Sequence, residues 1–142
     1  MAILRSILEP AFAKNPPVKV SVSAPMLGGV VTVLGALGVL VALLAALGAT
    51  AFAGAGLPFI VLVLVRGAGA GLAAYGGYQM YQYDPAGRNR VVYGLLLFFV
   101  PEVLLIVYSP LNELFTMLVA AAVYYLVILS HFPVDTTQHP AS

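Results

Sequence analysis

The sequence contains no cysteine, and only 8% of its 142 residues are charged. Without cysteine, the chain forms no disulfide, offers no thiolate to a metal ion and carries no palmitoylation site. Its six basic and five acidic side chains give a net charge of +1, which provides no basic field for nucleic acid. We therefore expect no nucleic-acid partner.

Hydrophobic residues are in excess instead and make up 62% of the chain. Soluble domains carry roughly a quarter charged residues, whereas about 20 consecutive apolar residues suffice for a helix that crosses a bilayer. Four such runs occur, at residues 26–48, 57–81, 91–108 and 111–131. The predicted fold class is all-α: a polytopic membrane protein with four transmembrane helices in a bundle, which form a single membrane domain over residues 1–142.

Residues 1–24 precede the first span as a short cytoplasmic or interfacial segment. Within residues 1–14 the apolar side chains recur near one helical face, although Pro10 interrupts the pattern. A short interfacial helix fits this pattern, and a partly ordered N-terminus is the alternative. Residues 18–23 alternate between valine and polar side chains, which favours an extended segment. Residues 132–142 form a tail with too little apolar surface to fold alone.

Four spans place both termini on one side of the membrane, together with the loop between the second and third spans. That side holds five of the six basic residues, Arg5, Lys14, Lys19, Arg88 and Arg90. Because cytoplasmic loops are enriched in Lys and Arg, we expect both termini to be cytoplasmic. The expected location is a prokaryotic-type cell membrane, and a virion membrane is the alternative.

Two charged residues are expected within the bilayer, Arg66 in the second span and Glu102 in the third. They lie at similar depths on neighbouring antiparallel helices, so an ion pair between them is geometrically possible. Side chains lean toward the N-terminus of their own helix, however, which sends Arg66 outward and Glu102 inward. The alternative for Arg66 is to snorkel to the outer headgroups. Glu102 has to be buried against protein, paired or protonated.

Small residues recur at spacings of four on two of the spans, which lets a neighbouring helix approach closely. The candidate packing residues are Gly38 and Ala42 in the first span and Gly69, Ala73 and Gly77 in the second. The abundance of alanine and glycine throughout the chain is the competing explanation.

The end of the second span is amphipathic. Tyr75, Tyr78, Gln79 and Gln82 recur at helical spacing and form a polar stripe at a predicted membrane boundary. Tyrosines at the level of the headgroups explain this stripe. A contact with a lipid headgroup, a quinone or a partner is the alternative.

These features favour a non-catalytic accessory or structural subunit of a larger membrane complex, which docks through its Gly/Ala-rich faces and its intramembrane charges. Its partners are then the lipid bilayer and other membrane protein subunits. The second hypothesis is a small homo-oligomeric transporter coupled to protons or cations through Glu102. Few other polar side chains accompany Glu102 in the last two spans, which weakens that hypothesis.

The two histidines, His131 and His139, have no ligand spacing to a carboxylate. We therefore expect no catalytic residue, no metal site and no cofactor. An axial contact of His131 with a haem or a chlorin remains the alternative to an interfacial histidine.

Overall fold

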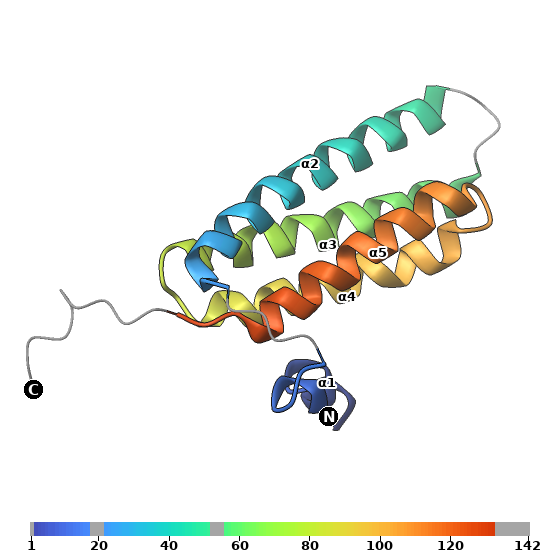
Figure 1. The fold of residues 1–142 in the computed structure, drawn as a ribbon. Helices are drawn as coiled ribbons and strands as arrows, with labels where there is room; N and C mark the ends of the chain where they lie inside the picture. Colours follow the sequence, from blue (N-terminus) through green and yellow to red (C-terminus); the bar gives the residue numbers. More distant parts are fainter. Residues whose placement is uncertain (1, 18–21, 52–55, 133–142) are drawn as a thin grey trace, which may run out of the picture.

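The computed structural model describes residues 2–17, 22–51 and 56–132, and these residues are helical apart from loops and one isolated β-bridge. Four long helices run side by side (Figure 1). They are α2 (Ala24–Ala51), α3 (Leu57–Tyr81), α4 (Ala86–Leu105) and α5 (Pro110–Leu129). Two short elements precede them, α1 (Ala2–Leu8) and the 3-10 helix η1 (Ala11–Ala13). The predicted all-α class is confirmed for this part of the chain.

Three of the helices are long and apolar enough to cross a membrane: α3, α5 and the Ala24–Gly48 part of α2. This agrees with the predicted integral membrane protein. The fourth long helix, α4, has the same length as α5 but carries three charged residues, Arg88, Arg90 and Glu102. Its composition therefore does not by itself identify it as a span.

The helix bounds differ most from the predicted spans at α4. This helix begins at Ala86 rather than Val91, and it ends at Leu105 rather than Tyr108. The Asp84 carboxylate accepts a hydrogen bond from the Ala86 amide (Oδ1 to N, 3.0 Å), so the helix starts directly at this turn. The sequence predicted a start at Val91 because the apolar run begins there. The two arginines ahead of it, Arg88 and Arg90, are polar, but they belong to the helix.

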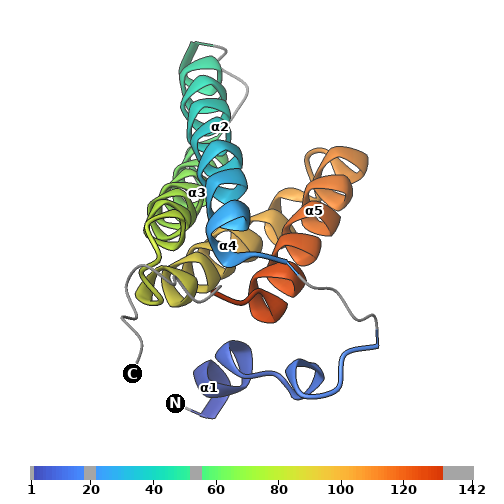
Figure 2. The ribbon, with the colours of Figure 1, turned by 60° about the vertical axis from the view of Figure 1, so that its left-hand side comes forward.

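α3 lies at the centre of the packing, with α2 on one side and α4 on the other (Figure 2). A Cβ at Gly69 would lie 2.5 Å from the Phe98 nitrogen and 2.7 Å from the Gly94 oxygen of α4. A Cβ at Gly77 would lie 2.7 Å from the Gly28 oxygen of α2. Side chains do not fit at these distances, so the close approach of three helix backbones depends on glycine.

The small residues singled out in the sequence lie at two helix contacts. Gly69 and Ala73 face α4, whereas Gly77 faces α2. Gly38 and Ala42 of α2 both face α3. In a helix of 3.6 residues per turn, a spacing of four rotates by about 40° at each step, so Gly69 and Gly77 face different neighbours.

Backbone hydrogen bonds join the start of α2 to the end of α5. The His131 nitrogen donates to the Val22 oxygen (3.1 Å), and the Ala24 nitrogen donates to the His131 oxygen (2.7 Å). The His131 side chain is exposed. This end of the bundle therefore holds the beginning of the first long helix next to the end of the last.

α1 packs against the same end of the bundle, where the Tyr124 hydroxyl of α5 donates to the Ile7 carbonyl. A helix is thus present in the N-terminal segment and ends before Pro10, while its position at a membrane interface stays a prediction. Of the predicted extended segment and tail, residues 18–21 and 133–142 lie outside the described residues.

The close approach at Gly69 predicts a difference between two neighbouring glycines of α3. Gly69→Ala should lower the free energy of unfolding by about 2 kcal/mol, because the added methyl group has to push α4 away. Gly71→Ala is the matched control, since its Cβ would meet only the Val39 side chain at 3.5 Å. Unfolding in mixed detergent micelles checks this, and equal stability of the two variants would contradict the packing.

Candidate functional site

The helices α3, α4 and α5 bring together one arginine and two glutamates. Arg66 Nη1 lies 2.8 Å from Glu102 Oε1 and 3.3 Å from Glu113 Oε2. The side chains of Arg66, Glu102 and Glu113 are 11%, 0% and 7% exposed, so the cluster is buried. One guanidinium nitrogen therefore links three helices through charge-assisted hydrogen bonds.

The structure places Arg66 beside Glu102. The level of Arg66 relative to the headgroups stays a prediction. The tilt of the two side chains along their helices had argued against this pair. The close approach of α3 and α4 at Gly69 and Gly94, only one turn away from Arg66, brings the two helices near enough to offset that tilt.

Glu113 was not identified from the sequence as a site residue. It is the fourth residue of α5, and a charge in the first turn of a predicted span is usually taken to lie at the membrane boundary. The connection between α4 and α5 covers only residues 106–109. That short connection is the signal that could have found it, because it places the first turn of α5 at the level of Glu102.

One carboxylate oxygen of the cluster lacks a hydrogen-bond donor among the described residues. Glu102 Oε2 is buried and has no hydrogen-bond partner among the described residues. The other two cations of the four long helices, Arg88 and Arg90, lie at the opposite end of α4, about 18 Å away along the helix axis. The cluster thus combines one cation with two acidic groups.

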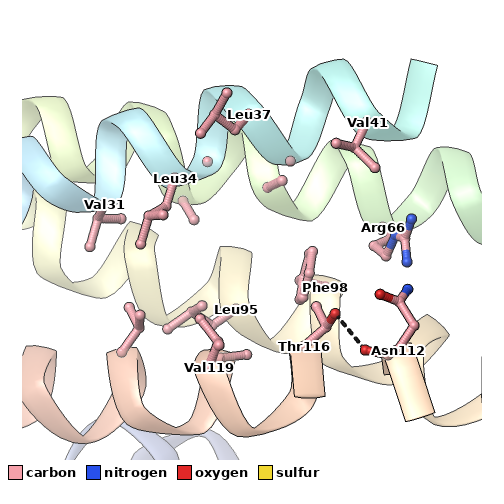
Figure 3. Close-up of a pocket in the computed structure, with 16 residues that line it drawn as sticks. Val31, Leu34, Leu37, Val41, Arg66, Leu95, Phe98, Asn112, Thr116 and Val119 are labelled. Carbon is pink, nitrogen blue, oxygen red and sulfur yellow. Dashed lines mark hydrogen bonds between the residues drawn. The ribbon is translucent and has the colours of Figure 1, made fainter. Parts of the chain in front are cut away.

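Arg66 of the cluster lies at one end of a groove of about 300 Å³ between α2 and α5 (Figure 3). α3 and α4 form the floor of this groove, and aliphatic side chains such as Leu37 and Val119 line its walls. Its polar side chains are Arg66, Asn112 and Thr116. Figure 2 shows that α2 and α5 spread apart above α3 and α4, so the groove opens between these two helices on one side of the bundle.

Asn112 lies at the same end of this groove as Arg66. It is exposed and points toward Arg66 (Figure 3). Thr116 donates its hydroxyl hydrogen bond to the Asn112 backbone oxygen (2.9 Å), which leaves the side-chain amide uninvolved. In the part of the chain that the structure describes, this amide has no hydrogen-bond partner. A hydrogen-bonding group is therefore available at the end of the apolar groove where Arg66 lies.

The tyrosine and glutamine stripe lies at the other end of α3 and does not take part in the cluster. Gln79 accepts a hydrogen bond from Arg90, whose guanidinium lies 5.5 Å from the centroid of the Tyr75 ring. Gln82 Nε2 donates to the Tyr78 hydroxyl (3.0 Å). These polar groups are thus bound within the chain, and their contact with headgroups, a quinone or a partner stays a prediction.

Across residues 2–17, 22–51 and 56–132, no group of three histidine or acidic side chains is arranged to hold a metal ion. Comparison with known proteins finds no matching family model, no matching curated protein and no matching solved structure. The function therefore has to be argued from the geometry of the cluster and the groove.

The buried cluster predicts a large cost for the loss of its cation. Arg66→Met should lower the free energy of unfolding by about 3 kcal/mol, because it leaves two buried acidic groups without their partner. Arg5→Met is the control, since the Arg5 and Glu9 side chains are exposed and their pairing stabilises little. Detergent unfolding of both variants measures this, and similar losses in the two would rule out a stabilising cluster.

Proposed function

We propose that the chain crosses the membrane four times and that α4 is the third span. Arg66 of α3 contacts Glu113 of α5 far from Tyr81, the last residue of α3. Because α4 leads from the end of α3 to the start of α5, it has to return to the level of Arg66. Its 20 residues extend about 30 Å, which matches the thickness of the hydrocarbon core.

The charges of α4 agree with such a crossing. Arg88 and Arg90 lie in its first two turns, where Arg88 donates to the Ile128 carbonyl near the end of α5. Four crossings place this end, the start of α2 and both termini on one side of the membrane. The basic residues gather on that side, which supports cytoplasmic termini in a prokaryotic-type cell membrane.

We further propose that the protein is a non-catalytic subunit of a larger membrane assembly, and that a partner's transmembrane helix occupies the groove between α2 and α5. The observation that carries this proposal is the exposed Asn112 at one end of an apolar groove, whose side-chain amide has no hydrogen-bond partner among the described residues. Lipid tails cannot hydrogen-bond an amide that faces them, whereas asparagine side chains do hydrogen-bond across transmembrane helices. Arg66 is already held by two carboxylates, so we assign the docking contact to Asn112.

The alternative is a small homo-oligomeric transporter coupled to protons or cations through Glu102. The second buried carboxylate, Glu113, favours it. Apart from Arg66, Asn112 and Thr116, however, the groove is lined by apolar residues only. The geometry thus supports a helix-binding surface better than a polar route across the bundle.

Site-specific photocrosslinking in the native membrane tests the groove. Benzoylphenylalanine at Leu37, which lines the groove, should crosslink to one discrete membrane polypeptide. Leu40 is the matched control, because it lies on the same helix with the same exposed fraction of 53% but outside the groove. Asn112→Leu should abolish the Leu37 crosslink, since it removes the hydrogen-bonding group.

Two results would contradict the subunit proposal. Equal crosslinking of lipid at both positions would show that the groove faces only the bilayer. A crosslink from position 37 to a second copy of this chain would show a homo-oligomer and favour the transporter.

A further inference from the structure

We propose that Arg66, Glu102 and Glu113 form a proton-binding site, in which the two carboxyl groups share one proton at neutral pH. This inference concerns the buried cluster of these three side chains and does not depend on what occupies the groove.

The geometry places both carboxyl groups on the same donor. Arg66 Nη1 lies 2.8 Å from Glu102 Oε1, and it lies 3.4 Å and 3.3 Å from the two oxygens of Glu113. Two carboxylates held around one nitrogen repel each other strongly when both are ionised, because little water screens them. A proton shared between them removes this repulsion.

The charge count leads to the same conclusion. With both glutamates ionised, the cluster has a net charge of −1 in a buried position, which is costly in hydrocarbon. No other charged residue belongs to the three helices α2, α3 and α5: α2 carries none, α3 carries only Arg66 and α5 carries only Glu113. The remaining charges of α4 are the two arginines at its opposite end. A bound proton is therefore what makes the cluster neutral.

The free carboxylate oxygen is independent support for a proton. Glu102 is fully buried, and its Oε2 has no partner among the residues that the structure describes. A buried ionised oxygen without a hydrogen bond is strongly disfavoured. A proton shared by the pair lowers the negative charge on the Glu102 carboxyl group, and with it the cost of leaving this oxygen without a hydrogen bond. The proton belongs to the pair as a unit, as expected for two strongly interacting acids.

Infrared spectroscopy of the purified protein in a sodium-free detergent without ester groups tests this site. At neutral pH the wild-type protein should show the C=O stretching band of one protonated carboxyl group per chain, shifted in D₂O. Glu102→Gln and Glu113→Gln should each remove the band, because the single remaining carboxylate is then balanced by Arg66. Glu9→Gln is the control and should leave it unchanged, since the Glu9 side chain is exposed.

Three results would overturn the proposal. Absence of the band from the wild-type protein would show that both glutamates are ionised, and this measurement does not require any variant to fold. A band retained in either glutamine variant would assign the proton to one glutamate alone. Loss of the wild-type band on addition of Na⁺ would identify the site as a cation site that is occupied by sodium when sodium is present.

Discussion

A charge inside a bilayer needs a partner within the protein, because acyl chains offer it neither a counter-ion nor a hydrogen bond. This constraint applies to the end of the bundle that holds Arg66. Arg66 of α3 meets it by contacting Glu102 of α4 and Glu113 of α5 through one guanidinium nitrogen. The contact fixes the positions of the three helices relative to one another along their axes. It therefore determines where the turn between α4 and α5 lies, and it supports the proposal that α4 crosses the membrane with its neighbours.

Two kinds of contact hold the four long helices. Glycine lets α3 approach both α2 and α4 at the distance of backbone contact, at Gly77 and Gly69 respectively. α5 packs less extensively. It is held by the buried cluster, by Arg88 at its last turn, by the short turn after α4, and at its end by core contacts and backbone hydrogen bonds to the start of α2. The bundle is consequently close-packed on one side and open between α2 and α5. The proposed binding groove follows from this difference in packing.

The sequence predicted the all-α class, and it identified Arg66 and Glu102 because each is a single charge in a long apolar run. The sequence did not identify Glu113, because a charge next to a Ser–Pro turn is typical of a membrane boundary. Only the three-dimensional turn between α4 and α5 brings its side chain into the protein interior beside Arg66. Gly69, Ala73 and Gly77 recur at a single spacing in the sequence, and the rotation of the helix divides them between two neighbours. Local patterns thus predicted the elements, while the contacts between elements depended on the exact positions of turns.

The crossing of α4 is the central claim, since the burial of the cluster in hydrocarbon rests on it. The absence of cysteine allows a direct test with single-cysteine variants at exposed positions. A membrane-impermeant maleimide added to intact cells should label Ser109→Cys, between α4 and α5. It should label Asn89→Cys, at the start of α4, only after the membrane is opened. Labelling of both positions from the same side of the membrane would contradict the account.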